Sequence, residues 1–227
     1  MDKHYGLVAL LPMKLHSERV PGKNFKEFSG QPLFTWILNS LLSVEKIEKV
    51  VINTDAVDVL EKYDIIQNEK IILRNRPEEI RGDLVSMNKV IHDDISHIES
   101  DHYLMTHTTN PLISHDTINN AISEYFKSIE SGFDSLFTVN QFQSRFYYKD
   151  VSPINHNPAE LIRTQDLEPI YEENSCLYLF SGKSFDCTNA RIGEKPSIYS
   201  TPKYESIDID DYESWKLADL IKKSINK

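Results

Sequence analysis

A short apolar run that leads into a basic loop constrains the fold of this chain more than any other feature. The run covers residues 6–11, and residues 33–44 carry apolar side chains at the spacing of an amphipathic helix. The loop between them is basic although the chain has a net charge of −10; its basic residues are Lys14, His16, Arg19, Lys23 and Lys26. Because α/β sheets bind phosphates at the carboxyl end of a first parallel strand, the loop predicts an anion site.

The residue types in this loop favour anion binding. Pro12 fixes the exit from the strand, Ser17 offers a hydroxyl, and Pro21 with Gly22 sets a turn. Lys23 follows as a point charge suited to a phosphate. The loop matches neither of the glycine-rich phosphate motifs, G-x-x-x-x-G-K-[ST] and G-x-G-x-x-G. A charged loop that binds nothing is the alternative, since most charge clusters are solvated surfaces.

Strand and helix patterns alternate along most of the chain. Beyond residue 44, the expected strands are 49–55, 70–74, 102–107, 135–139, 175–180 and 197–201. The expected helices are 57–63, 87–98, 118–129 and 215–225. This alternation predicts an α/β fold, a mostly parallel, doubly wound (Rossmann-like) sheet with helices on both faces. We expect one domain over residues 1–227, with a small extended insertion arm at about 141–170.

Bulk composition excludes several classes of protein. A net charge of −10 and a pI of about 5.3 argue against a general binder of nucleic acid or of membrane surfaces. No apolar window reaches the roughly 18 residues of a transmembrane helix, and the first apolar run is too short for a signal peptide. Cys176 and Cys187 do not make a disulfide framework. We therefore expect a reduced, cytoplasmic protein.

A second candidate site lies where residues 206–210 read Ser-Ile-Asp-Ile-Asp. Strand-like alternation places Asp208 and Asp210 on one face and the two isoleucines on the other. Two carboxylates one residue apart offer hard oxygen ligands, which substrate phosphates and waters would complete to an octahedral Mg²⁺ site. An acidic strand end followed by a helix N-cap at Asp210 or Asp211 is the alternative.

Two further polar loops follow predicted strands at the same edge of the sheet. Arg76 lies in the first loop and can hold a phosphate or a carbonyl bidentately, or can pair with Glu78 or Glu79 instead. His107 opens the second loop, where it can donate to a substrate hydroxyl, act as a base near neutral pH, or serve the structure only. We expect His107 to contact the substrate.

Residues 12–24 resemble the signature P-A-R-x-x-S-[KR]-x-[IL]-P-x-K-N of the acylneuraminate cytidylyltransferases, also called CMP-sialic acid synthetases. Similar segments follow in the family's order at 76–86, 107–112, 163–174 and 206–210, so the resemblance covers nearly the whole chain. It implies an enzyme that transfers CMP from CTP to the anomeric hydroxyl of a sialic-acid-like keto-acid sugar and releases pyrophosphate. It also implies bound Mg²⁺, a homodimer formed through the arm, and a role in surface polysaccharide biosynthesis.

The resemblance also assigns roles to the positions that match the family's motifs. The implied nucleotide-binding residues are Pro12, Lys14, Ser17, Arg19, Lys23, Asn24, Arg76 and Ser86. The implied contacts to the sugar are His107, Thr109, Arg163, Gln165, Asn174 and Tyr178. Asp208 and Asp210 are the implied metal ligands, and these two aspartates and Lys23 are the implied catalytic residues.

The chain departs from the family's pattern in its phosphate loop. Lys14 replaces an arginine, Leu15 and His16 stand where the family has glycines, and Glu18 replaces a frequent lysine. These changes favour an alternative outside the enzymes, namely a catalytically silent homologue that binds a nucleotide. The run Ser17–Lys23 also fits the CMP-Kdo synthetases, which are the nearest enzymatic alternative, although the fourth-strand loop lacks the aspartate of that family.

Overall fold

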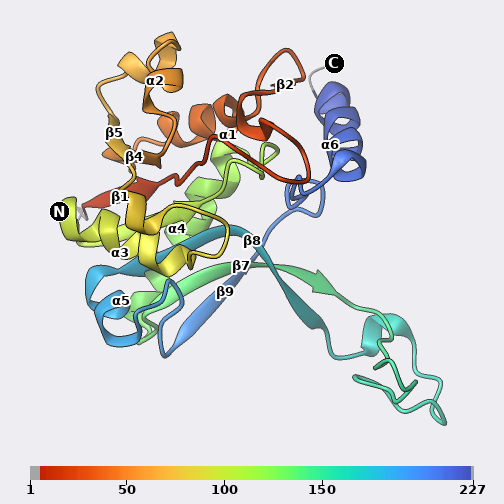
Figure 1. The fold of residues 1–227 in the computed structure, drawn as a ribbon. Coiled ribbons are helices and arrows are strands. Elements are labelled where there is room, and N and C mark those ends of the chain that lie inside the picture. Colours follow the sequence, from red (N-terminus) through yellow and green to blue (C-terminus); the bar gives the residue numbers. More distant parts are fainter. Residues whose placement is uncertain (1–5, 226–227) are drawn as a thin grey trace.

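The structure, a computed structural model that describes residues 6–225, is built on a seven-stranded sheet (Figure 1). In sheet order the strands are β5 (Ile71–Asn75), β4 (Lys49–Thr54), β1 (Leu7–Leu10), β6 (His102–Thr106), β8 (Ile170–Ser181), β7 (Ser135–Phe142) and β9 (Pro196–Ser200). Strand β8 is antiparallel to both of its neighbours, whereas every other neighbouring pair in this sheet is parallel. The predicted mostly parallel α/β fold is therefore confirmed.

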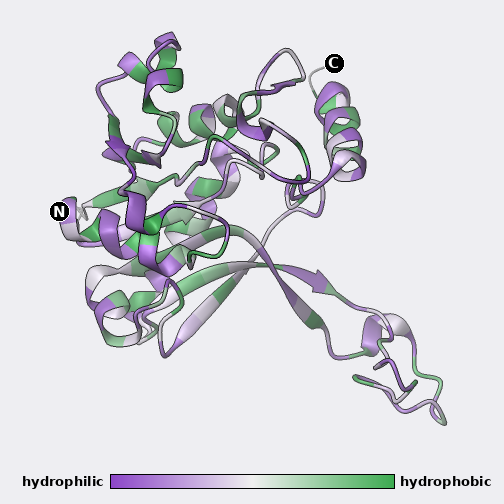
Figure 2. Cartoon of the chain, in the orientation of Figure 1, coloured by the Kyte–Doolittle hydropathy of each residue, from purple (hydrophilic) through white to green (hydrophobic). Residues whose placement is uncertain are grey.

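Helices cover both faces of the sheet because successive strand residues point to opposite sides. The helices are α1 (Leu33–Leu42), α2 (Val57–Leu60), α3 (Met87–His97), α4 (His115–Glu130), α5 (Gly182–Thr188) and α6 (Tyr212–Ile225). In β1, Leu7 and Ala9 pack in one cluster with α1 and α4, while Val8 and Leu10 pack in another with α3 and α5. Figure 2 shows the hydrophobic residues along these strands and helices. Within residues 6–225, no helix combines the length and apolarity needed to cross a membrane.

The order of the strands places a crevice at the end of β1. The chain leaves β1 through α1 to β4 and β5 on one side, then returns through α3 to β6 on the other side of β1. In doubly wound sheets, ligands bind at this reversal, beyond the carboxyl ends of the strands. The loops that follow β1 and β6 therefore face each other across the expected binding position.

Helix α6 and a small hairpin form a third hydrophobic cluster beside this crevice. The hairpin joins β2 (Glu27–Phe28) to β3 (Gln31–Pro32), and Phe28 packs edge-on against Trp215 of α6 at 5.4 Å between ring centroids. Ile209 is fully buried in the same cluster, and its backbone N–H donates to the Thr109 carbonyl at 2.9 Å. Residues 206–210 therefore lie between α6 and the crevice.

The strand-like pattern expected for residues 206–210 is only partly right. These residues pair with no strand, yet Ile207 and Ile209 face the cluster beside α6. Asp211 caps α6, because its Oδ1 accepts from the Ser214 backbone N–H at 2.8 Å. Asp211 is therefore the N-cap of α6. The Asp210 side chain does not cap the helix but contacts Arg19 and Lys23.

An extended arm projects from the sheet between β7 and β8 (Figure 1). Strands β7 and β8 stay paired from Ser135–Phe180 out to Phe142–Ile170, with an irregularity between Phe137 and Val139. Both strands are longer than the sequence pattern predicts. In β8, Ser175 has a φ of 56°, a left-handed conformation that glycine adopts most easily and that the resembled family provides with a glycine. Residues 143–169 form the far end of the arm.

Candidate active site

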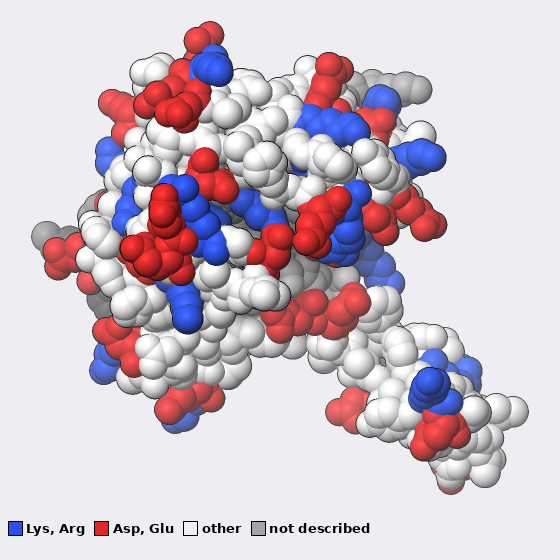
Figure 3. Space-filling view, in the orientation of Figure 1, with Lys and Arg blue, Asp and Glu red and all other residues white. Residues whose placement is uncertain are grey.

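A cleft of about 360 Å³ opens at the crevice, a size within the ~300–1,000 Å³ of small-molecule sites. Its lining residues are Pro12, Met13, Lys14, Ser17, Glu18, Arg19, Val20, Lys23, Asn24, Arg76, Asp83, Met87, His107, Thr108, Thr109 and Asp210. Figure 3 shows Lys and Arg side chains in the hollow of this face, flanked by Asp and Glu side chains. Loops separated widely in sequence therefore meet in one polar cleft.

The loop that follows β1 is fixed at both ends. The Met13 N–H donates to the Asn53 carbonyl at 3.0 Å, which extends the pairing of β1 with β4. Asn24 is only 4% exposed; its Nδ2 donates to the Lys14 carbonyl at 2.7 Å, and its Oδ1 accepts from Thr108 Oγ1 at 2.6 Å. Asn24 thus joins the two ends of the loop to the loop after β6, which is a positioning role.

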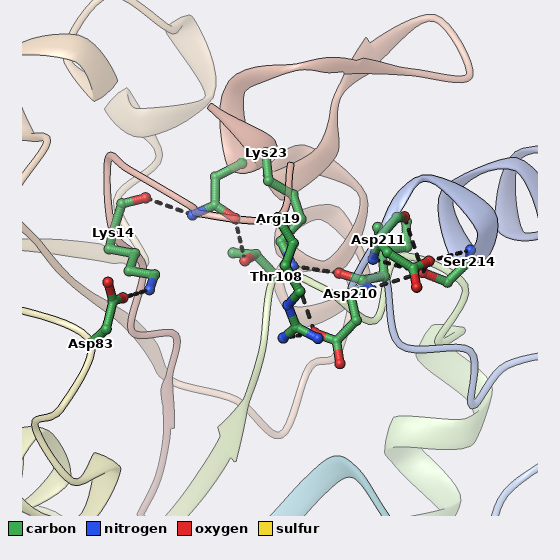
Figure 4. Close-up of polar contacts among 10 residues, drawn as sticks. Lys14, Arg19, Lys23, Asp83, Thr108, Asp210, Asp211 and Ser214 are labelled. Carbon is green, nitrogen blue, oxygen red and sulfur yellow. Dashed lines mark hydrogen bonds and ion pairs between the residues drawn. The ribbon is translucent and has the colours of Figure 1, made fainter. Parts of the chain in front are cut away.

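Lys23 links the basic loop to the segment that carries the two aspartates. Gly22, at a φ of 64°, turns the chain so that Lys23 begins a short 3₁₀ turn. The Lys23 ammonium is nearly buried, donates to the Ile209 carbonyl, and lies 4.0 Å from Asp210 Oδ1. Arg19 Nη2 donates to the same Asp210 oxygen at 2.7 Å (Figure 4). Burial lowers the pKa of Lys23, and the neighbouring carboxylates oppose that effect.

Asp208 and Asp210 lie near each other and offer oxygen ligands suited to a divalent cation. Asp208 Oδ1 is buried without a hydrogen-bond partner among the described residues. Burial raises the pKa of Asp208, Asp210 adds to the rise, and Thr109 and Lys23 oppose it. No cluster of three or more His, Cys, Asp or Glu side chains that could hold a metal occurs within residues 6–225. A carboxylate pair with an unpartnered buried oxygen fits Mg²⁺, which takes its other ligands from waters and phosphates.

The other basic residues of the cleft already have partners. Lys14 forms an ion pair with Asp83 (Figure 4). Arg76 is only 7% exposed, and it donates through Nε and Nη2 to Asn53 at 2.8 and 2.7 Å and to the Met13 carbonyl at 3.2 Å. These bonds are made in place of the alternative pairing with Glu78 or Glu79. They fix Arg76 at the base of the cleft.

His107 lines the cleft and contacts an arginine that the sequence patterns do not reveal. Arg191 Nη1 lies 3.4 Å from His107 Nε2, and its guanidinium stacks on the Tyr178 ring at 3.7 Å from the centroid. Burial lowers the pKa of His107 to about 3, with Arg191 and Lys23 adding to the effect. His107 is therefore neutral at pH 7.

Five of the predicted nucleotide and sugar contacts lie outside the cleft lining. Ser86 caps α3 by accepting from the Asn88 N–H, and Asn174 donates to Thr201 Oγ1 at 2.7 Å inside the protein. The Tyr178 ring is completely buried. Arg163 and Gln165 lie on the arm, where Arg163 Nε donates to Asp166 at 2.7 Å. The structure thus brings together Pro12, Lys14, Ser17, Arg19, Lys23, Asn24, Arg76, His107, Thr109 and Asp210, with Asp208 alongside.

The sequence patterns assign no role in the site to Asp83, Thr108 or Arg191. Asp83 follows Gly82 in the polar loop that also contains Arg76. Because that loop follows a predicted strand, the sequence could have identified Asp83 as a candidate site residue. Thr108 lies between His107 and Thr109, both of which are expected to contact the sugar. Arg191 follows α5 and reaches the site only through tertiary packing on Tyr178, for which no local pattern exists.

A buried polar network lies behind the cleft. Arg74 pairs with Asp94 and, at 3.0 Å, with Asp93. Asn53 Nδ2 donates to Asp94 Oδ1 at 2.7 Å, and Asn53 Oδ1 accepts from Arg76 Nε at 2.8 Å. Burial raises the pKa of Asp94 to about 6, against the opposing effects of Asn53 and Arg74. This network connects the orientation of Arg76 to a titrating group.

The raised pKa of Asp94 predicts a pH dependence of stability. Between about pH 4 and about 6 the folded state binds more protons at Asp94 than the unfolded chain does. The free energy of unfolding contributed by this group therefore falls as the pH rises through that window. Asp94→Asn should remove this component. Between pH 4 and 7, the free energy of unfolding measured with urea should therefore fall less steeply with pH in this variant than in the wild type. The control is Asp101→Asn, an exposed aspartate; identical slopes for wild type and Asp94→Asn would contradict the assignment.

Solved structures first define the class of fold. The chain is similar to CMP:2-keto-3-deoxy-manno-octonic acid synthetase complexed with CTP, with a TM-score of 0.64, 13% identity, and coverage of 97% of this chain and 99% of that chain. It is also similar to 4-diphosphocytidyl-2C-methyl-D-erythritol synthase of Anaerococcus prevotii, with a TM-score of 0.69, 12% identity and 97% of both chains covered. The fold is the Rossmann-like fold of these nucleotidyltransferases.

Sequence comparison then defines the family. A family model described as cytidylyltransferase matches residues 8–222, and the chain therefore belongs to the cytidylyltransferase family. The pseudaminic acid cytidylyltransferase of Campylobacter jejuni is 23% identical, over 95% of this chain and 96% of its own. The CMP-N,N'-diacetyllegionaminic acid synthase of Legionella pneumophila is 26% identical, over 95% of both chains. The N-acylneuraminate cytidylyltransferase A of Danio rerio is 26% identical over 93% of this chain, which spans 49% of that longer protein.

These findings confirm the resemblance that the sequence motifs indicate. The chain is a CTP-dependent nucleotidyltransferase, and it is similar to the acylneuraminate cytidylyltransferases. The changes at Leu15, His16 and Glu18 lie in a loop whose backbone is nevertheless held by Asn24 and by pairing with β4.

Proposed function

We propose that this enzyme transfers CMP from CTP to the anomeric hydroxyl of a nonulosonic acid, a sialic-acid-like keto-acid sugar. The names of its relatives in Campylobacter, Legionella and Danio state sugar acids of this kind. The observation that supports the proposal most is the meeting of the basic loop with Asp208 and Asp210 at one crevice. A triphosphate bound by this loop would therefore lie beside the carboxylates proposed to hold its metal ion.

The proposed reaction is a substitution at phosphorus. The anomeric oxygen of the sugar bonds to the α-phosphorus of CTP, the bond from that phosphorus to the bridging oxygen breaks, and pyrophosphate leaves. The hydroxyl proton is released. Catalysis of this type depends mainly on positioning and on stabilisation of charge. Lys23 is suited to both, because it is nearly buried and its position is fixed by the Ile209 carbonyl.

Binding of the triphosphate would exchange two ion pairs. Lys14 is paired with Asp83, and Arg19 with Asp210 at 2.7 Å. Exposed ion pairs of this kind contribute little to stability, so the larger charge of a triphosphate can displace both carboxylates. The exchange would free Asp210 at the moment when the phosphates arrive.

Asp208 and Asp210 are the residues that would hold Mg²⁺. When bound, the ion would neutralise charge on the phosphates and on the leaving pyrophosphate. The unpartnered oxygen of Asp208 and the mutual repulsion of the two carboxylates support this role.

His107 would serve the sugar as a hydrogen-bond donor. Arg191 Nη1 is directed to His107 Nε2 at 3.4 Å, so the neutral imidazole accepts there and carries its proton on Nδ1. The pKa of His107, lowered by burial to about 3, leaves little basicity at neutral pH. We therefore propose His107 as a positioning contact instead of the general base.

We further propose that the arm forms a homodimer. Its exposed large apolar side chains are Tyr147, Tyr148, Val151, Ile154, Leu161 and Ile162. Exposed apolar surface gathered in one place is typical of protein interfaces. Arg163 and Gln165 also lie on the arm, so any contact they make with a sugar would be in the cleft of a second copy.

The free state of Cys176 and Cys187 supports a cytoplasmic location.

The dimer can be tested by light scattering of the purified protein. Wild type should have the mass of two chains, and Leu161→Glu, at a side chain that is 88% exposed, should shift the population toward the monomer. The matched control is Leu220→Glu on α6, where the side chain is 67% exposed. A wild-type monomer, or a dimer that Leu220→Glu disrupts and Leu161→Glu does not, would count against the arm as the interface.

The function is tested by pyrophosphate release. Purified protein is supplied with Mg²⁺, CTP and one of a panel of sugar acids that includes sialic, legionaminic and pseudaminic acids and Kdo, with UTP, ATP and GTP as controls. Release with CTP and one nonulosonic acid is expected. Release with Kdo alone would favour the CMP-Kdo alternative. Binding of CTP by calorimetry without release on any sugar would favour a silent homologue.

A further inference from the structure

Arg191 occupies the position that the resemblance gives to an aromatic contact. Tyr178 is the residue expected to meet the sugar, yet its ring is completely buried and its hydroxyl is bonded to Glu173 and, at 3.1 Å, to Ser175. The guanidinium of Arg191 lies on the face of that ring, 3.7 Å from its centroid. A sugar that approaches Tyr178 from this side therefore meets Arg191 first.

The charge of Arg191 is only weakly compensated within the protein. Its contacts are to uncharged groups: Tyr178 Oη at 2.9 Å, His107 Nε2 at 3.4 Å and Met105 Sδ at 3.7 Å. Among the described residues, Glu173 is the one carboxylate within 4.0 Å of Arg191, and at 3.7 Å it is beyond hydrogen-bonding distance. The side chain is 20% exposed, so a ligand can reach it while water screens it little. An arginine with a weakly compensated charge and an accessible side chain is suited to bind an anionic ligand.

A second pocket, lined in part by Arg191, adjoins the cleft. Glu173, Arg191 and the first residues of α3 line it, and Met87 belongs to the lining of both cavities. His107 gives a second connection, because it lines the cleft and touches Arg191. This second pocket therefore lies beside the cleft and is called the side chamber below.

We propose that Arg191 binds the carboxylate of the acid sugar in this side chamber and thereby selects acidic over neutral sugars. The inference rests on the proposed function, because it needs an acid sugar as substrate. A planar guanidinium can bind a carboxylate through two parallel hydrogen bonds, and stacking on Tyr178 holds that plane in a fixed orientation. The triphosphate charge is met by the basic loop and the sugar charge by Arg191, so the two anions are kept apart.

The test compares a sugar acid with its methyl ester, which lacks the charge. For wild type, kcat/KM should be about 10- to 100-fold higher with the acid, the size expected for a hydrogen bond to a charged group. Arg191→Gln should lower kcat/KM for the acid by a similar factor, reduce the preference for acid over ester to a few-fold, and leave KM for CTP unchanged. Arg191→Lys, which keeps the charge and loses the fork, should fall between the two. Lys195→Gln, an exposed lysine on the same loop, is the matched control.

The outcomes separate the inference from the function on which it rests. Undiminished preference for the acid in Arg191→Gln would overturn the inference alone. Equal loss with acid and ester, together with a lowered Tm, would also overturn it, because that result describes a packing role on Tyr178. Failure of wild type to release pyrophosphate with any sugar acid would overturn the proposed function, and the inference with it.

Discussion

Asp208→Ala is expected to reduce the rate of pyrophosphate release by about 100-fold or more while the protein stays folded. Charge stabilisation by a bound metal contributes several kcal/mol to a transition state, and each 1.36 kcal/mol is a factor of about ten in rate. The Asp208 carboxylate is held in the protein with one oxygen that has no hydrogen-bond partner among the described residues. Because burial already raises the pKa of Asp208, removal of this carboxylate should not lower the free energy of unfolding appreciably.

The measurement is kcat as a function of Mg²⁺ concentration, for wild type and Asp208→Ala. The matched control is Asp211→Ala, which removes a nearby acidic residue that caps α6 through Ser214. Loss of this helix cap should lower the stability of the protein and leave kcat unchanged. Wild-type turnover by Asp208→Ala, or an equal loss of activity in Asp211→Ala, would refute the metal assignment.

Lys23→Met is expected to lower kcat/KM for CTP by about 100-fold. Two losses combine in this variant. The triphosphate loses a charge-assisted hydrogen bond, a contact that contributes about 1.5–3 kcal/mol. The Ile209 carbonyl also loses its donor, so the segment that carries Asp208 and Asp210 is held less firmly.

Steady-state kinetics with CTP as the varied substrate measure this effect, and calorimetry measures the loss of CTP affinity separately. Lys26→Met is the matched control, because Lys26 is exposed and its ammonium lies over the rings of Tyr212 and Trp215 at 4.7 and 5.6 Å. That variant should keep kcat/KM within a few-fold of wild type. If Lys23→Met retained wild-type kinetics, the basic loop would not be the triphosphate site.

The central sheet could be predicted from the sequence because its inner strands are buried and its long helices are strongly periodic. In β1 every residue is buried, which makes a continuous apolar run. Elements with little periodicity could not be found in this way. Strands β2 and β3 are two residues long each, and α5 has Lys, Ser and Asp among its seven residues. The length of β7 and β8 depends on their pairing with each other beyond the sheet, which no local pattern records.

The residues of the candidate site also differ in how far the sequence predicts them. Pro12 to Asn24 and Asp208 to Asp210 could be proposed because each set lies within a short, patterned stretch. Resemblance places Tyr178 against the sugar, and only packing reveals that Arg191 covers it. Arg163 and Gln165 illustrate the converse, since a segment that matches a motif lies on an arm outside its own cleft. Resemblance assigns a residue to a role, but it does not tell whether the fold brings that residue to the site.

The bond between Lys23 and Ile209 joins positions 186 residues apart in the chain. Helix α6, which seats Ile209 against the hairpin, is synthesised after every other element described above. The seating of the carboxylate pair therefore depends on α6, whereas the strands of the sheet and the basic loop precede it in the chain. If Asp208 and Asp210 hold the metal ion as proposed, truncation within α6 should yield a protein that folds around its sheet without turning over.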